Sequence, residues 1–107
     1  MPFVAIQIDK FVDEYQPGIV ECHLTDAHGE IHFFVEKVPY VSTENLWWDS
    51  DYPRPGSIAC EVVDEWVDEF GRQLARISTE TPWSIASTTG STLFIVFSAQ
   101  MMMCRLG

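Results

Sequence analysis

Short runs in which every second residue is apolar constrain the fold of this chain more than any other feature. Three such runs cover residues 3–9, 19–25 and 30–37, and in the first every second position from residue 4 is valine or isoleucine. Successive side chains of a β-strand point to opposite faces of a sheet, so a period of two indicates strands with one buried face. The sequence therefore predicts an antiparallel β-fold.

The second and third runs are predicted to form a hairpin around Asp26-Ala27-His28-Gly29. Aspartate favours the start of a type I turn, and glycine accepts the left-handed conformation at its end. A four-residue loop pairs even positions of one strand with odd positions of the other. The expected core pairs are then Leu24–Ile31, Cys22–Phe33 and Val20–Val35.

Residues 57–77 fit two patterns. As a helix over 57–70, they carry an apolar stripe with Ser57 as N-cap and Gly71 just past the C-terminus. As strands, they are rich in β-branched residues, and Asp68-Glu69-Phe70-Gly71 repeats the Asp-x-x-Gly loop. We favour strands, and an α+β fold with a helix at 57–70 is the alternative.

Residues 38–56 lack alternation and contain several prolines, so we expect an irregular connection there. Residues 82–86 and the apolar run 92–97 are expected to form a last pair of strands around a turn at 87–90. About six short strands joined by tight hairpins avoid long exposed edges by closing. The predicted fold is all-β: a small antiparallel barrel forming a single domain over 1–107.

The net charge of −10 limits the classes of partner. Only six lysines and arginines are present, which argues against a nucleic-acid backbone and against an anionic membrane surface. No apolar stretch approaches the roughly 18 residues of a membrane span, and the start of the chain reads as a strand rather than a leader peptide. We therefore expect a cytoplasmic protein.

Catalytic signatures are not found in the sequence. It holds no nucleophile-elbow, zinc-protease, phosphate-loop or dinucleotide-binding motif, so we lean against an enzyme and expect no cofactor. The three cysteines (Cys22, Cys60 and Cys104) are far apart and show no Cys-x-x-Cys spacing, so we expect reduced thiols.

Two histidines form the first candidate site. The expected hairpin register places His23 opposite His32 on a solvent face, where cross-strand histidines can share a metal ion with a carboxylate. The glutamates expected on that face are Glu21, Glu30 and Glu36. A solvated polar face accounts for the same residues, so we predict no metal site.

Aromatic residues form the second candidate site. Trp47, Trp48 and Tyr52 lie close together on the irregular connection, beside Arg54 and two aspartates. Clustered aromatic side chains on a loop can bind a ligand or anchor an interface. Alternatively, one or two of them cover the open end of the barrel.

Acidic residues form a third cluster, which could engage a basic partner or simply be a solvated face. Its members are Glu61, Asp64, Glu65, Asp68 and Glu69. Our first functional hypothesis is a non-catalytic acidic module that binds a basic protein partner. The alternative is a small-ligand or metal-binding barrel that uses the loop aromatics or the pair of histidines. Methionines at 101–103 suggest an apolar contact with another subunit, and hence a homo-oligomer.

Several stretches of the chain resemble a group of short, uncharacterised bacterial proteins. The resemblance is carried by 52–63, by Trp66, Asp68 and Gly71-Arg72, by Thr81-Pro82-Trp83 and by Glu36-Lys37-Val38-Pro39. It spans most of the chain and implies a bacterial origin and a β-rich fold. It implies no activity and no site residues.

Overall fold

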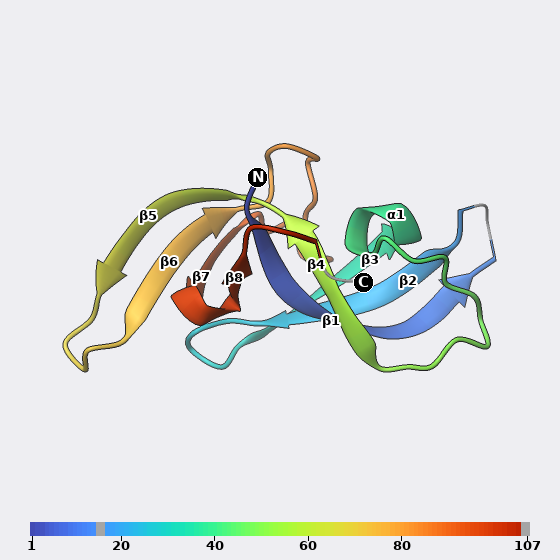
Figure 1. The fold of residues 1–107 in the computed structure, drawn as a ribbon, viewed down its shortest axis with the longest axis horizontal. Coiled ribbons are helices and arrows are strands. Elements are labelled where there is room, and N and C mark those ends of the chain that lie inside the picture. The colour runs from blue at the N-terminus through green and yellow to red at the C-terminus, as the bar shows by residue number, and fades with distance from the viewer. Residues whose placement is uncertain (15–16, 106–107) are drawn as a thin grey trace.

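Two antiparallel sheets make up the fold in the computed structural model, which describes residues 1–14 and 17–105 (Figure 1). The first sheet has the order β3–β2–β1–β4, with β8 paired to β1. Its strands are β1 (Phe3–Asp13), β2 (Ile19–Thr25), β3 (Ile31–Lys37), β4 (Arg54–Ala59) and β8 (Met101–Met102). The second sheet contains β5 (Glu61–Val67), β6 (Gln73–Ser78) and β7 (Leu93–Phe97), in that order. The chain also forms two short helical turns, α1 (Val38–Val41) and η1 (Ser98–Gln100).

The predicted all-β class is confirmed, but the described strands hydrogen-bond as two sheets rather than as a closed barrel. Between β4, in the first sheet, and β5, in the second, the chain has only Cys60. The helix considered for 57–70 is wrong, because that stretch contains the end of β4, the whole of β5 and a turn. None of the helices in the described part has the length and apolar character needed to cross a membrane.

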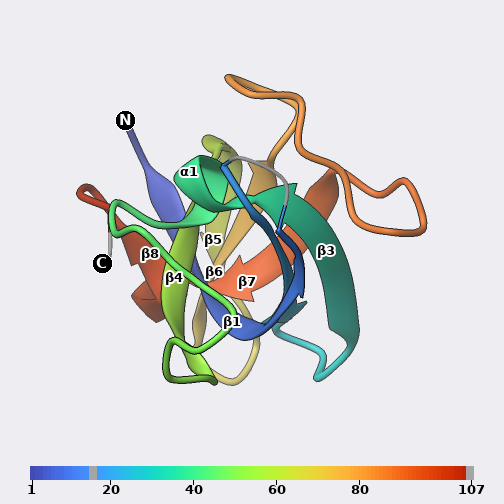
Figure 2. The same cartoon turned by 90° about the vertical axis from the view of Figure 1, so that its right-hand side faces the viewer.

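Two loops connect the sheets at the edges of β3 and β7. The loop before β7 lies on the same side of the molecule as β3 (Figure 2). The Ala27 N–H of the β2–β3 turn donates to the Ile95 carbonyl of β7 at 2.8 Å. In the reverse direction, the Thr88 N–H donates to the Phe33 carbonyl of β3, also at 2.8 Å. These bonds cover parts of two edges that would otherwise present unpaired backbone groups.

One core runs through both sheets, with β1 at the centre of the first. The aliphatic residues predicted on one face of β1 are buried, and β6 and β7 contribute further buried residues from the second sheet. Its largest fully buried side chains include Phe34, Ile8, Leu24, Ile58 and Ile77. Met101 packs against this core and, with Met102, pairs with the start of β1, so part of the methionine run has a role within the chain.

A single loop type occurs three times, at 26–30, 68–72 and 87–91. In each loop the first residue's N–H donates to the fifth residue's carbonyl, and the glycine at the fourth position donates to the first residue's carbonyl. A side-chain oxygen of the first residue accepts from the fifth residue's N–H. The three glycines have φ between +79° and +87°, a range that disfavours side chains. This is a type I turn followed by a glycine bulge.

The bulge overturns the predicted register of the β2–β3 hairpin. Three residues, rather than an even number, lie between Asp26 and Glu30, so Cys22 pairs with Phe34 and Leu24 pairs with His32. The predicted pairs Leu24–Ile31, Cys22–Phe33 and Val20–Val35 are therefore wrong. Residues of β2 face the core as expected, whereas those of β3 are inverted. Phe34 is buried, and the exposed residues on the outer face of β3 are Ile31, Phe33 and Val35.

The two adjacent phenylalanines of β3 test this register. We expect Phe34→Ala to lower the free energy of unfolding by about 3–5 kcal/mol, because a fully buried ring is replaced by a cavity. Phe33→Ala should cost about 1 kcal/mol or less, since its side chain is largely on the surface. Urea unfolding followed by circular dichroism measures both. Equal losses in the two variants would contradict the register.

Candidate functional site

Two adjacent tryptophans stand out on the connection between α1 and β4, because they remain exposed in a chain with an ample core. Trp47 is 53% exposed and Trp48 is 70% exposed. Together they form one wall of a hollow of about 260 Å³. We call this the Trp47–Trp48 hollow. Among the described residues, its lining consists of Phe11, Glu14, Pro17, Gly18, Leu46, Trp47 and Trp48.

Local hydrogen bonds hold the tryptophan wall in place. The Trp47 N–H donates to Ser50 Oγ at 2.9 Å, and the Ser50 N–H donates back to the Trp47 carbonyl at 3.1 Å. The Tyr52 hydroxyl donates to the same carbonyl at 2.7 Å. Leu46 is buried and anchors the segment in the core. The exposed rings therefore sit on a closed turn with a fixed base.

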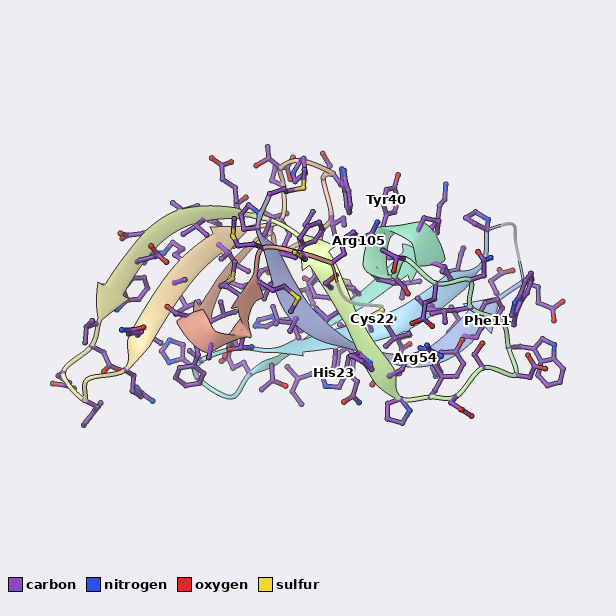
Figure 3. All side chains as sticks on the ribbon, in the orientation of Figure 1. Phe11, Cys22, His23, Tyr40, Arg54 and Arg105 are labelled. Carbon is purple, nitrogen blue, oxygen red and sulfur yellow. The ribbon has the colours of Figure 1, made fainter. Side chains whose placement is uncertain are left out.

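The opposite wall is formed by Phe11 near the end of β1, by Glu14 just after it, and by Pro17 and Gly18 just before β2. Phe11 lies toward the end of the molecule away from β5, β6 and β7 (Figure 3). Gly18 has a φ of +94°, and a Cβ added there would lie 2.9 Å from the Phe11 ring. Only glycine fits this position without displacing Phe11.

The four residues predicted as a binding site have three different roles in the structure. Trp47 and Trp48 line the hollow. Tyr52 is half-buried behind them and packs against the core, and burial raises the pKa of its hydroxyl. Arg54 forms an ion pair with Glu44 and is not part of the lining. The alternative expectation, that one or two of the aromatic residues cover the core, therefore applies to Tyr52.

Phe11 and Glu14 complete the hollow, and sequence reasoning did not select them. The first strand was expected to end at residue 9, but β1 continues to Asp13 with register shifts after Ile8 and Phe11. These irregularities break the alternation that identified the strand. An apolar pair at Phe11-Val12, directly before two acidic residues, was the available signal.

Aromatic and acidic residues occur together at the hollow. Glu14 belongs to the lining, and the exposed Asp49 directly follows Trp48 in the chain. The face of an aromatic ring carries partial negative charge and attracts an ammonium or guanidinium group. The geometry can therefore bind a positively charged side chain, whose alkyl part would contact the rings.

The predicted pairing of His23 with His32 is wrong, because the corrected register places them on opposite faces of the hairpin. His23 pairs with Phe33, and its Nδ1 lies 2.8 Å from a carboxylate oxygen of Asp9. The Nε2 of His32 lies 2.8 Å from Asp26 Oδ2. The two imidazoles cannot share a metal ion.

The third predicted cluster is divided between two structural contexts. Three of its acidic residues lie on β5, an edge strand, where charges discourage pairing with another chain. Asp68 instead closes the following turn and forms an ion pair with Arg72. The cluster is therefore not one continuous site.

Two of the three thiols are buried: Cys22 lies on β2, and Cys60 lies between β4 and β5. All three cysteines are free. Burial, reinforced by nearby carboxylates, raises the pKa of Cys22 to about 12, and burial raises the pKa of Cys60 to about 11. Both thiols therefore stay protonated at neutral pH and are poor nucleophiles. Cys104 is exposed.

Comparisons with protein-family models, with curated proteins and with solved structures found no match for this chain.

Tryptophan fluorescence tests the exposure of the hollow. Trp66 and Trp83 are half-buried, so we expect the neutral quencher acrylamide to act mainly on Trp47 and Trp48. Trp48→Phe should lower the Stern–Volmer constant, while Trp83→Phe should raise it by removing a shielded emitter. A neutral quencher is needed because the protein's negative charge repels iodide. If Trp48→Phe left the constant unchanged, the exposed position of Trp48 would be refuted.

Proposed function

We propose that this protein is a non-catalytic interaction module, and that its Trp47–Trp48 hollow binds a basic side chain of a protein partner. The observation that supports this most strongly is the exposure of two adjacent tryptophans around a concave surface that includes a carboxylate. Tryptophan and tyrosine are enriched among the residues that contribute most to interface affinity.

A protein partner accounts for the exposed area of the tryptophans. Trp48 keeps 70% of its surface in water, although the same chain buries other large apolar side chains fully. Covering this ring with a partner would recover the hydrophobic free energy that the isolated chain leaves unused. The supporting bonds from Ser50 and Tyr52 hold the wall ready, which reduces the entropy cost of binding.

The negative charge of the protein favours a basic partner. The net charge of −10 attracts cations over long range and speeds their encounter with the protein. Glu14 then provides a local partner for an ammonium or guanidinium group within the hollow. A lysine or arginine side chain fits both features, because its stem is apolar and its end is charged.

A small cationic ligand is the second candidate, favoured by the concave shape and the volume of about 260 Å³. It would use the same rings and the same carboxylate. A partner protein would in addition contact residues outside the hollow. A location in a bacterial cytoplasm remains our expectation, and three free cysteines fit a reducing compartment.

The test compares two aromatic substitutions that leave the charge unchanged. Trp48→Ala removes a wall of the hollow, whereas Phe70→Ala removes an equally exposed ring from the β5–β6 turn. Proteins of a bacterial host extract that bind the parent protein are identified by mass spectrometry, and their affinity is then measured by calorimetry. We expect a basic partner whose affinity falls at least about tenfold with Trp48→Ala and stays unchanged with Phe70→Ala.

The dependence of binding on ionic strength, and the size of the molecules that bind, distinguish a basic protein partner from a small cationic ligand. Binding of a basic partner should weaken as ionic strength rises, because screening reduces the long-range attraction. If only small cations bind, the second candidate is supported. A partner whose affinity is the same for the parent and Trp48→Ala would refute the role of the hollow.

A further inference from the structure

A cluster of polar side chains belongs to the turn of the β2–β3 hairpin, at the opposite end of β2 from Gly18 and the Trp47–Trp48 hollow. It combines one imidazole and two carboxylates: His32, Asp26 and Glu30. A donor atom from each residue lies within 4.8 Å of the donor atoms of the other two. We call this the hairpin triad.

Asp26 and His32 are held in place by contacts other than the one between them. Asp26 is 8% exposed, and its Oδ1 accepts the N–H groups of His28 and Glu30 at 2.8 and 3.0 Å. This leaves Oδ2 directed toward His32, at 2.8 Å from Nε2. The His32 ring packs edge-on against Phe94 with 4.9 Å between centroids. Such contacts fix a ligand's orientation before a metal arrives.

The equivalent loop in the second sheet shows what the hairpin triad lacks. There, the fifth residue is Arg72, whose Nε donates to Asp68 Oδ2 at 2.7 Å and neutralises that carboxylate. In the first loop the fifth residue is Glu30, which adds a second negative charge. Over residues 1–14 and 17–105, no lysine or arginine forms an ion pair with Asp26 or Glu30. The same backbone loop is thus balanced by a cation in one sheet and not in the other.

Two carboxylates meet in the hairpin triad, since the donor oxygens of Asp26 and Glu30 lie within 4.8 Å of each other. Two negative charges this close favour a cation between them.

We propose that Asp26, Glu30 and His32 bind a divalent transition-metal ion, with zinc as the representative. One imidazole nitrogen and carboxylate oxygens are donors that zinc accepts. Zinc would take the place of the proton on His32 Nε2, and the neutral imidazole would carry its one proton on Nδ1. Glu30 would turn its exposed carboxylate toward the ion. This site does not depend on the Trp47–Trp48 hollow or on the proposed partner.

Zinc titration by isothermal calorimetry tests the proposal, in a Cys104→Ser background because an exposed thiol also binds zinc. We expect one zinc ion per chain. Glu30→Gln should weaken binding at least about tenfold by removing one of three ligands, and His32→Gln should do the same. Glu30 is exposed, so Glu30→Gln is expected to fold normally, and thermal melting without zinc checks both variants.

Matched variants separate the hairpin triad from other acidic or histidine groups. Glu69→Gln removes an exposed carboxylate from the equivalent loop, and His23→Gln removes the other histidine that is paired with an aspartate. Neither should change the zinc affinity. Glu30→Arg copies the Asp68–Arg72 arrangement, so it should keep the fold and abolish zinc binding.

Three results would overturn the proposal. The first is zinc binding that persists unchanged in Glu30→Gln and His32→Gln, which would mean diffuse binding to the acidic surface. The second is an equal loss of affinity in Glu69→Gln or His23→Gln, which would place the ion elsewhere. Failure to detect any zinc binding by the folded parent would also refute it.

Discussion

The glycine bulge in the β2–β3 loop determines which side chains of β3 reach the core. With Gly29 in the left-handed conformation at the fourth position, the loop contains one residue more than a plain four-residue turn. The pairing of β3 with β2 is therefore shifted by one position relative to the register of a four-residue loop. Since strand side chains alternate between faces, a shift by one exchanges the buried and exposed residues of that strand. Phe34 is buried and Phe33 exposed for this reason.

The class of fold could be predicted from the sequence. The register of the β2–β3 hairpin and the division of the strands into two sheets could not. Alternation at Val4, Ile6 and Ile8 identifies β1 because one face of that strand is buried. In β3 alternation points to the wrong face, because Ile31, Phe33 and Val35 are exposed, whereas the inner face carries Phe34 between the polar residues His32 and Glu36. Periodicity cannot then select the inner face, and the choice rests on the length of the turn. The two sheets are joined by a bond from the β2–β3 turn to β7 and by a bond from the loop before β7 to β3, and these segments are far apart in the sequence.

The candidate site was identifiable only in part, for a related reason. Trp47 and Trp48 are adjacent and lie on an irregular segment, so composition alone marks them. Their partner Phe11 comes from a strand more than thirty positions earlier, and its contact with Gly18 depends on tertiary packing. Tyr52 and Arg54 are near the tryptophans in sequence but turn toward the core and toward Glu44. Proximity in sequence thus identified the segment but not the direction of each side chain.

The distribution of basic residues connects the hollow with the hairpin triad. All four arginines already interact within the chain. Arg54, Arg72 and Arg76 pair with carboxylates, and Arg105 donates to backbone carbonyls and lies over the neighbouring rings of Phe3 and Trp83.

With the arginines engaged in this way, the acidic excess of the chain is left for interactions from outside. Glu14 in the hollow and Glu30 at the hairpin have no ion pair with lysine or arginine among the described residues. At the hollow, aromatic rings add the apolar surface that suits a lysine or arginine stem, while at the hairpin an oriented imidazole adds a metal ligand. In both proposals, the chemistry beside each carboxylate, rather than the net charge, therefore decides which kind of cation it binds.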